Sequence, residues 1–167
     1  MALTQTGVLS FPCVFEAQAY GDGKPKYSAT LIFDKTVSQD GLIEEMKAAL
    51  VKKFGEVPAK WKNPIKDGDQ KTDKDGVQRP EYVGKWYITL SCKEGDKPVV
   101  VDENKDIILD RNEIYGGCLA RASFNPFAYD YLGSKGVSLY LKGIQKLGAG
   151  EPFSVGSNAM DDFGSPF

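Results

Sequence analysis

Residues 82–93 read Tyr-Val-Gly-Lys-Trp-Tyr-Ile-Thr-Leu-Ser-Cys-Lys, a stretch in which apolar and polar side chains alternate. An apolar side chain occupies every second position from Trp86 to Cys92, and Tyr87 or a polar residue lies at each position between. Successive side chains of a β-strand point to opposite faces, so this pattern predicts a strand with one face in a core. Four other parts of the chain repeat the pattern.

These other alternating stretches are also predicted as strands. They span residues 7–18, 26–33, 114–124 and 137–147, and a short apolar strand is expected at 98–101. Pro12 interrupts the first stretch, where a proline indicates an edge position or a bulge. Gly116 and Gly117 predict a bulge in the stretch that begins at residue 114. Residues 125–135, Asn-Pro-Phe-Ala-Tyr-Asp-Tyr-Leu-Gly-Ser-Lys, are expected to connect the last two strands.

One helix is predicted, from Gln39 to Phe54. Ser38 precedes it as a favourable N-cap, apolar residues recur with helical spacing, and Gly55 follows its end. Five long alternating strands with one main helix predict a mainly β protein, and a five-stranded OB-fold-like β-barrel with long loops is the best match. The usual OB helix lies between the third and fourth strands, whereas this one precedes the third. Either the strand assignment is wrong or the topology is a variant of the OB-fold.

The chain is expected to form one domain and a tail. Its 167 residues are enough for one core, and we place an OB-fold-like domain at 1–149 and a flexible acidic tail at 150–167. The formal net charge is −2, of which Glu151, Asp161 and Asp162 in the tail contribute −3, leaving +1 for the body. Any electrostatic site for nucleic acid must therefore come from the arrangement of the charges.

Composition excludes several kinds of chemistry. The chain has no histidine, which excludes Ser-His-Asp and Cys-His nucleophiles and His-ligated zinc. Its cysteines, Cys13, Cys92 and Cys118, lack Cys-x-x-Cys spacing and are expected as reduced, buried thiols in a cytoplasm. No apolar run approaches the roughly 20 residues of a membrane span. We expect no catalytic residue, no metal ion, no cofactor and no membrane contact.

A surface for nucleic acid is predicted from the OB pattern, in which ligands lie across the outer face of the second and third strands, flanked by the 1–2 and 4–5 loops. In this chain those places carry lysines and aromatic residues, and so does the long loop at 56–80. Cations can pair with phosphates and flat rings can stack on bases, which is the combination that binds single-stranded nucleic acid. The residues predicted to contact DNA are Lys24, Lys26, Lys60, Trp61, Lys62, Lys66, Arg79, Lys85, Tyr87, Arg121, Phe127, Tyr129, Tyr131 and Lys135.

Some of these residues have a structural alternative. Trp61 could fold back over the end of the barrel, and Tyr129 and Tyr131 could plug its mouth. Lys85 and Arg121 could be solvated surface charges. The sequence also leaves open whether the outer face or the loop tips hold DNA.

The end of the chain is predicted to bind a partner. It reads Asp161-Asp162-Phe163-Gly164-Ser165-Pro166-Phe167. A terminal phenylalanine supplies an apolar ring and a free carboxylate at one point, and a pocket of apolar side chains rimmed by Arg or Lys can bind both. The residues assigned to partner binding are Asp161, Asp162, Phe163, Pro166 and Phe167. Because the tail has the same sign of charge as DNA, a further hypothesis places it in the body's cationic groove when DNA is absent.

This ending resembles the acidic tips of bacterial single-stranded DNA-binding proteins, which finish Asp-Asp-Ile-Pro-Phe or similar. It differs in Phe163, which replaces an aliphatic residue, and in the Gly-Ser insertion before Pro166. The body is more similar to bacteriophage single-stranded DNA-binding proteins, which have a divergent OB-fold and an acidic, Phe-terminated tail. The resemblance implies sequence-independent binding and protection of single-stranded DNA in the cytoplasm of a bacterial host. It also implies that the tail recruits replication and recombination proteins.

Two other functions stay open at the level of sequence. A phage structural or assembly protein could dock on a partner through its tail while its β-barrel binds no nucleic acid. A metal-dependent nuclease could use Asp67, Asp69 or Asp102 with Glu103, although these acids lie in loop-like segments without a matching catalytic lysine motif. We therefore expect a protein that is not an enzyme. Its oligomeric state is not fixed by the sequence, and a homodimer stays open.

Overall fold

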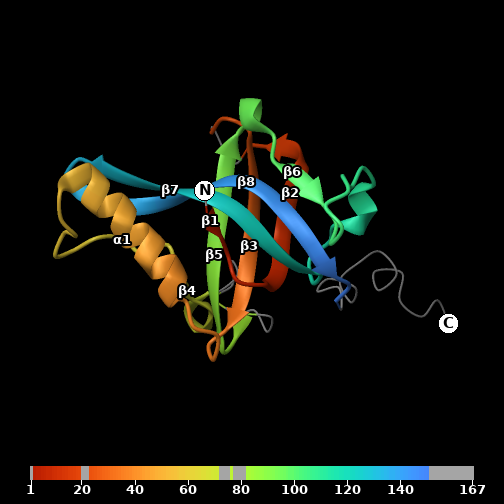
Figure 1. Cartoon of the computed structure of the whole chain (residues 1–167), viewed down its shortest axis with the longest axis horizontal. Helices are drawn as coiled ribbons and strands as arrows, with labels where there is room; N and C mark the ends of the chain where they lie inside the picture. The colour runs from red at the N-terminus through yellow and green to blue at the C-terminus, as the bar shows by residue number, and fades with distance from the viewer. Residues whose placement is uncertain (1, 20–22, 72–75, 77–81, 151–167) are drawn as a thin grey trace.

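The computed structural model of the chain describes residues 2–19, 23–71, 76 and 82–150. In this part, one sheet and one α-helix make up the body (Figure 1). The helix α1 spans Asp40–Phe54. The strands are β1 (Ala2–Leu3), β2 (Gly7–Gln18), β3 (Lys26–Asp34), β4 (Lys66–Asp67), β5 (Lys85–Lys93), β6 (Val99–Val101), β7 (Leu119–Tyr131) and β8 (Ser134–Gly148).

Five long strands form a closed ring. The sheet order runs β7-β2-β3-β5-β8, and an additional pairing between β7 and β8 completes the circuit. The pairing of β5 with β8 is parallel and the other four are antiparallel. This is the strand arrangement of an OB-fold, so the predicted mainly β, five-stranded OB-like architecture is confirmed. Two of the pairings are short. The strand β5 pairs with β8 at Ser91 and Tyr140, and β2 pairs with β7 at Gly7 and Val8. The result is a ring of strands rather than a strict barrel.

The core of the ring lies on the face that the alternation predicted. Tyr27, Ala29, Leu31 and Phe33 on β3 are buried, as are Ile88, Leu90 and Cys92 on β5. The register of β2 against β3 shifts between Ser10 and Cys13, so Pro12 lies at a bulge, which was one of its two predicted roles. The bulge brings Val14 into the core and leaves Cys13 only partly buried. The expectation that all three cysteines are buried is therefore wrong for Cys13.

The helix follows β3, which is the second strand of the ring, whereas the usual OB helix follows the third. The topology is therefore a variant of the usual OB order. It starts at Asp40, one residue later than predicted, and its N-cap is Gln39. The Ser38 hydroxyl accepts a hydrogen bond from the Asp40 amide at 3.3 Å, but Ser38 is the residue before the N-cap. Gly55 ends the helix in a left-handed conformation with φ 80°, where its amide donates to the Val51 carbonyl at 2.7 Å.

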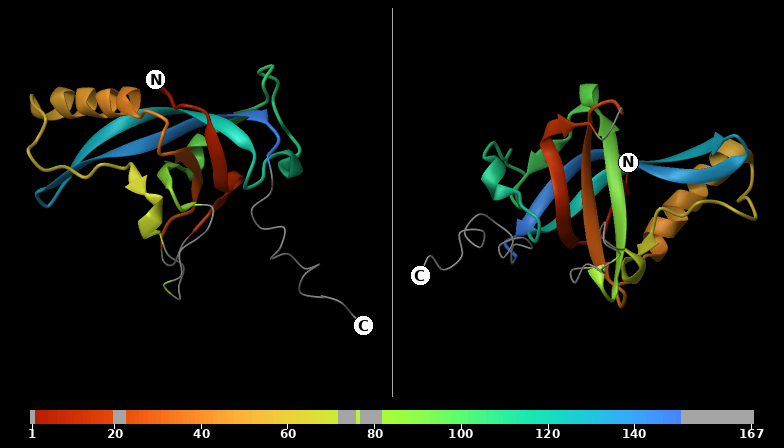
Figure 2. Two further views of the ribbon diagram at one scale, coloured as in Figure 1. Left: turned by 90° about the horizontal axis from the view of Figure 1, so that it is seen from below. Right: turned by 180° about the vertical axis from the view of Figure 1, so that it is seen from behind.

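Strands β7 and β8 form a long hairpin that projects beyond the ring, and α1 lies along it (Figures 1 and 2). We call residues 125–139, the part of this hairpin outside the ring, the arm. The predicted connection at 125–135 is therefore wrong, because both strands continue through it to a two-residue turn at Leu132 and Gly133. Both turn residues have positive φ, as a type I′ hairpin requires. The arm exists because α1 gives one of its faces a core, where Ala128 and Val137 are buried.

The start of β7 also differs from the prediction. The strand begins at Leu119 rather than at residue 114. Gly116 and Gly117 form a turn before it and not a bulge within it. Gly117 has φ 118°, a conformation that favours glycine, and its amide donates to the Leu9 carbonyl at 2.7 Å.

Part of the long loop at 56–80 packs back on the ring. Its residues 66–67 form β4 against β5, and a 3₁₀ turn follows at Gly68–Gln70. Tyr82 beyond it is fully buried, and its hydroxyl lies 2.9 Å from the Ser10 hydroxyl on the outer face of β2. One end of the outer face is therefore covered by the chain itself. In the described residues, no helix is long and apolar enough to cross a membrane.

Candidate nucleic-acid interface

A groove lies between the arm, the loop before β4 and the outer face of β5, and we call it the arm groove. Its volume is about 240 Å³. Three of the predicted DNA contacts, two lysines and a tyrosine, lie in its lining together with several hydroxyl groups. The lining residues are Lys62, Asn63, Pro64, Lys66, Thr89, Ser91, Tyr129, Val137, Ser138 and Leu139.

Lys62 is fixed at the side of the arm by its own backbone. Its amide donates to the Lys135 carbonyl at 2.9 Å, and its carbonyl accepts from the Val137 amide at 3.3 Å. The partner position is Gly136, where a Cβ atom would lie 2.6 Å from the Tyr129 hydroxyl oxygen and 2.9 Å from the Lys62 Cβ. Glycine at this position therefore allows the tyrosine and the lysine to approach the same point of the arm.

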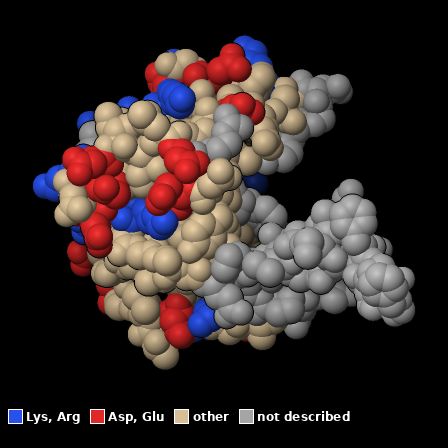
Figure 3. All heavy atoms as spheres, turned by 90° about the vertical axis from the view of Figure 1, so that its right-hand side faces the viewer, with Lys and Arg blue, Asp and Glu red and all other residues tan. Residues whose placement is uncertain are grey.

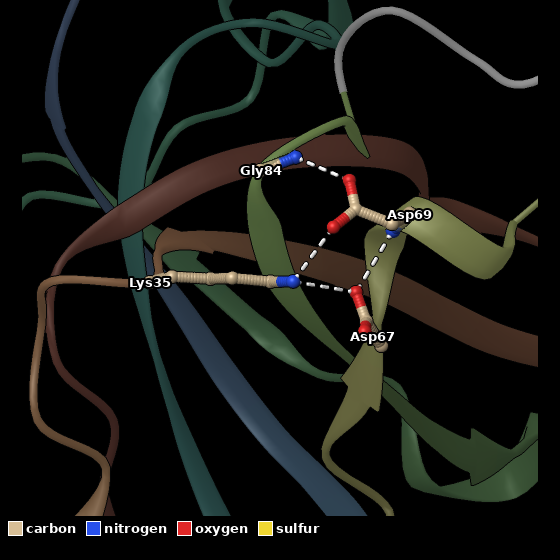
Figure 4. A network of polar contacts seen from close by, with 4 residues as sticks. All are labelled: Lys35, Asp67, Asp69 and Gly84. Atoms are coloured by element: carbon tan, nitrogen blue, oxygen red, sulfur yellow. Dashed lines mark hydrogen bonds and ion pairs between the residues drawn. The ribbon is translucent and has the colours of Figure 1, made fainter.

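Lys66 is brought to the groove by β4, where it pairs with Tyr87. A network of charged groups holds this segment (Figure 4). The Lys35 Nζ lies 2.8 Å from a carboxylate oxygen of Asp67 and 2.8 Å from one of Asp69. The other Asp69 oxygen accepts from the Gly84 amide at 2.7 Å, so both sides of the 70–83 segment are tied to the end of β3.

The network makes stability depend on pH. Hydrogen bonds to Asp67 and Asp69 raise the pKa of Lys35, and the same bonds from Lys35 lower the pKa of both carboxyl groups. A carboxyl group whose pKa is lower in the folded state stabilises the fold at pH values above its unfolded pKa, which is about 3.9 for Asp. This contribution is lost as the pH falls through the pKa of the folded state. The contribution from Lys35 is present at neutral pH and is lost only at strongly alkaline pH.

We expect Lys35→Met to lower the melting temperature at pH 7, because both carboxylates lose their partner. The difference from wild type should become smaller at about pH 2, where the carboxyl groups are protonated in either protein. The part that remains there belongs to the contact of the Lys35 Nζ with the Trp86 ring, whose centroid is 4.9 Å away. Thermal unfolding followed by circular dichroism across this pH range measures it. Lys52→Met, an exposed lysine on α1, is the matched control. A difference that is the same at every pH would show that the network is not its cause.

The arm carries a row of aromatic side chains on the face that α1 leaves open. Phe127, Tyr129 and Tyr131 alternate along β7, so they share the face opposite the buried Ala128. Phe127 is 59% exposed and Tyr131 is 72% exposed, whereas Tyr129 is half-buried against Gly136. The prediction placed these rings in a loop, but a rigid hairpin spaces them. They do not plug the mouth of the ring.

Four other predicted contacts lie at the start of β3 or in loops. Lys26 at the start of β3 is exposed and pairs across the sheet with Lys93. Lys24 and Lys60 are exposed in loops, and Trp61 is half-buried against the core. For Trp61 this is the alternative placement, folded back on the body.

Four of the five remaining predicted contacts do not line the groove. The Tyr87 ring is half-buried and makes a T-shaped contact with the Tyr82 ring, with ring centroids 5.1 Å apart. Lys85 is paired with Asp34 at 3.1 Å. Lys135 has its Nζ 4.7 Å from the Phe54 ring on the helix side of the arm, and Arg121 lies in a different hollow. Arg79 is outside the described residues, as is the predicted partner-binding set Asp161, Asp162, Phe163, Pro166 and Phe167.

Sequence reasoning left several lining residues out of the predicted contacts. The alternation showed that Thr89 and Ser138 face outward, but a hydroxyl residue in a strand does not by itself indicate a DNA contact. Tyr140 continues the row beyond the arm, next to Ser91 on β5. Its hydroxyl donates to Asp96, which lowers the pKa of that carboxyl and raises the pKa of the tyrosine.

On the side of the body away from the arm, the acidic and basic side chains of the described residues are interspersed (Figure 3). The acids considered for a nuclease have other partners, since Asp67 and Asp69 bind Lys35 and the Asp102 carboxylate accepts the amides of Asn104 and Asp106. Among the described residues, no group of three or more potential ligands could hold a metal ion.

A ring of five strands in OB order, with lysines and aromatic rings along a groove on its outer face, defines the class of single-stranded nucleic-acid-binding OB proteins. The chain belongs to the family described as Enterobacter phage Enc34, ssDNA-binding protein, whose family model matches residues 2–166. The resemblance to bacteriophage single-stranded DNA-binding proteins is confirmed by this match.

Solved structures agree with the family match. The single-stranded DNA-binding protein from bacteriophage Enc34 in complex with ssDNA is 25% identical, covers 90% of this chain and 88% of its own, and superposes with a TM-score of 0.74. A second structure of the single-stranded DNA-binding protein from bacteriophage Enc34 gives a TM-score of 0.70 at 25% identity over 96% of this chain and 88% of its own. Gp2.5, a single-stranded DNA-binding protein encoded by bacteriophage T7, shares the fold at 15% identity, with coverage of 99% and 96% and a TM-score of 0.61. No curated protein sequence matches the chain.

Proposed function

We propose that this protein binds single-stranded DNA without sequence preference, with the arm groove as the centre of its binding surface. The observation that carries the proposal is that Lys62 and Lys66 line the same groove as Tyr129. The two lysines supply charge for phosphates, and the tyrosine supplies a ring on which a base can stack. The Enc34 protein in complex with ssDNA supports the assignment, because that chain has the same fold over most of its length.

The chemistry of the lining favours binding that ignores sequence. Besides the lysines, the polar groups are the hydroxyls of Thr89, Ser91, Ser138 and Tyr129, and the amide of Asn63, whose oxygen accepts the Ile65 amide at 2.8 Å. A hydroxyl donates or accepts as required, so it can meet the edge of any base, whereas specific readout uses bidentate side chains. Phe127 and Tyr131 extend the row of rings along the arm and give further bases a stacking surface.

The tail extends the proposal to partners. We infer an ssDNA-binding domain at 1–149 and an acidic tail at 150–167 that recruits replication and recombination proteins in a bacterial host's cytoplasm. The support is chemical, because Asp161, Asp162 and the terminal Phe167 offer two charges, a ring and a carboxylate in a short segment.

Fluorescence titration with oligo-dT and with a mixed-base oligonucleotide, each at two salt concentrations, tests the proposal. We expect tight binding to both at low salt and a steep loss of affinity at high salt. Equal affinities for the two sequences would support readout without sequence preference. No binding at low salt would instead favour a phage structural or assembly protein, and cleavage of the DNA after magnesium is added would favour a nuclease.

A further inference from the structure

A second groove lies on the outer face of the sheet, and we call it the edge groove. Its volume is about 450 Å³, and it crosses four neighbouring strands, β1, β7, β8 and β6. Leu3 and Val99 form apolar walls that face solvent, since these side chains are 62% and 56% exposed. The charged groups of the lining are Lys105, Arg121 and Lys142, and no acidic residue is among the described residues that line the groove. The edge groove therefore favours a ligand that combines negative charge with apolar surface.

The edge groove and the arm groove share the strand β8. Residues 137–139 of this strand line the arm groove, and residues 142–145 line the edge groove. Tyr140 lies between the two sets and faces outward, because its neighbours Leu139 and Leu141 are buried. At Tyr140 the strand pairs with β5, and further on it pairs with β6 (Figure 1). A ligand that follows β8 thus passes from one groove to the other over the Tyr140 side chain.

The Tyr140 ring is held in a fixed position. Its hydroxyl donates a hydrogen bond to the Asp96 carboxylate and accepts one from the Lys93 amide at 3.4 Å. The Asp96 charge is offset by the Lys93 Nζ, which lies 3.8 Å from its carboxylate. The Lys142 Nζ lies 5.2 Å from the centroid of the Tyr140 ring. A fixed ring with a cation beside it offers one base a stacking surface and its phosphate a charge.

Tyr140 also continues the row of rings on the arm. Phe127 pairs with Ser138, and the next outward-facing pair along the hairpin is Asn125 with Tyr140. Phe127 and Tyr140 are therefore diagonal neighbours, with Cα atoms roughly 7–8 Å apart. Tyr129 is two residues from Phe127 on the same face, which is about 7 Å along a strand. Three rings at similar spacing thus lie along the hairpin and lead towards the edge groove.

The Arg121 guanidinium is oriented within the edge groove. Its Nε donates to the Gln145 side-chain oxygen at 2.8 Å, and the Gln145 side-chain nitrogen donates to the Asp102 carbonyl at 3.2 Å. An arginine that is fixed through Nε can present its terminal amino groups to a phosphate, which it binds through parallel hydrogen bonds. The edge groove therefore has an oriented phosphate-binding group as well as apolar walls.

We propose that single-stranded DNA lies lengthwise along the β7–β8 hairpin, from the arm groove over Tyr140 into the edge groove. A base stacks on Tyr140 with its phosphate beside Lys142, and a phosphate further along the strand lies on Arg121. The distance from Gly136 to Gln145 along β8 is about 30 Å, and a track of this kind suits the roughly 4–16 nucleotides that one OB-fold covers. The inference rests on the proposed function, to which it adds a second part of the site and the direction of the strand.

The usual OB route is less open in this protein. It crosses the outer face of the second and third strands of the ring, which are β3 and β5. At one end of that face Tyr82 is fully buried, with its hydroxyl 2.9 Å from the Ser10 hydroxyl on β2. The Lys71 Nζ lies 5.2 Å from the Tyr82 ring centroid and 5.0 Å from that of Tyr87. A strand crossing this face would meet the chain itself, whereas the path along the hairpin ends in a groove.

Photocrosslinking of the full wild-type chain tests where the strand lies. One central thymine in an oligo-dT of about 12 nucleotides, within the range of an OB site, is replaced by 5-iodouracil. Because the proposed binding does not depend on sequence, the strand can shift along the track, and we expect irradiation to crosslink the modified base to both Tyr129 and Tyr140. Crosslinks to Tyr129 but none to Tyr140 would overturn the lengthwise path and leave the proposed function intact. No binding of the oligonucleotide at low salt would contradict both.

A charge variant tests the edge groove itself. Arg121→Gln/Lys142→Gln removes two of its cations, so the slope of log affinity against log salt for the same oligonucleotide should fall by about 1.4. An oligo-dT of about 4 nucleotides should bind within about twofold of wild type, because the arm groove alone can hold so short a strand. The melting temperature is measured alongside, since Arg121 also contacts Gln145.

The matched control is Lys47→Gln/Lys52→Gln, which removes the same charge from exposed positions on α1. A selective fall in slope for the groove variant supports the path. Equal slopes in the two variants would overturn it and would leave the edge groove to an apolar segment of a protein partner.

Discussion

Replacing Tyr129 by alanine should weaken the binding of oligo-dT by about 5- to 150-fold, which is the worth of one stacked base at 1–3 kcal/mol. Tyr129 is the aromatic residue that lines the arm groove together with Lys62 and Lys66. A base stacked on its ring would place its phosphates between the two lysines. The loss should be similar for every oligonucleotide sequence, because each base offers a flat face. Fluorescence titration at a fixed low salt concentration measures it.

Two further variants separate stacking from folding. Tyr129→Phe keeps the ring and should bind within about twofold of wild type, because stacking does not need the hydroxyl. Tyr129 also packs on Gly136, so the melting temperature of each variant has to be measured alongside its affinity. If Tyr129→Ala and wild type bind equally well, the base-stacking role of the arm groove is wrong.

The ring of strands was predictable because its signal is local. In β3 and β5, every apolar residue of the alternating pattern from Tyr27 to Phe33 and from Ile88 to Cys92 is buried. Alternation depends only on the pleat of a strand, so it survives without knowledge of the partner strands. The bulge at Pro12 was predictable for a similar reason, since proline removes a donor from the ladder. The burial of Val14 instead of Cys13 after the bulge was not predictable, because one extra residue exchanges the two faces of the strand.

The arm was not predictable, because its stability comes from a distant part of the chain. Asn125 and Pro126 have the composition of a turn, yet they continue β7 and pair with Tyr140 and Leu139. The strand persists there because α1 covers one of its faces, a contact between segments about 80 residues apart in sequence. Local propensity yields to tertiary packing at such positions.

The kinds of side chain in the candidate site were predictable from the sequence, but their location was predictable only in part. Lys62, Lys66 and Tyr129 were chosen for their chemistry and line one groove. Tyr87 was chosen by the same alternation, but it is half-buried against Tyr82, because a loop without periodicity folds back on the sheet. Alternation distinguishes inward from outward side chains, but it cannot tell which outward side chains another segment will cover.

Neutralising both lysines of the arm groove should change the salt dependence of DNA binding more than any other property. Each phosphate contact on a single strand contributes about 0.7 to the slope of log affinity against log salt, so Lys62→Gln/Lys66→Gln should lower that slope by about 1.4. The ratio of wild-type to variant affinity should therefore fall about 25-fold between roughly 50 and 500 mM salt. Titrations with oligo-dT at four or more salt concentrations measure the slope.

The size of the slope change distinguishes a phosphate contact from a general charge effect. Lys47→Gln/Lys52→Gln on α1 removes the same net charge from exposed positions outside the groove, so it is the matched control. A long-range field would weaken binding in both double variants alike, whereas direct contacts lower the slope only when Lys62 and Lys66 are changed. Equal slopes in the two variants would mean that phosphates lie elsewhere on the body. An intact slope with a lower affinity would mean that the lysines shape the groove without touching the DNA backbone. Only a selective fall in slope, together with the loss from Tyr129→Ala, requires a strand that lies in the arm groove with its phosphates on the lysines and a base on the tyrosine.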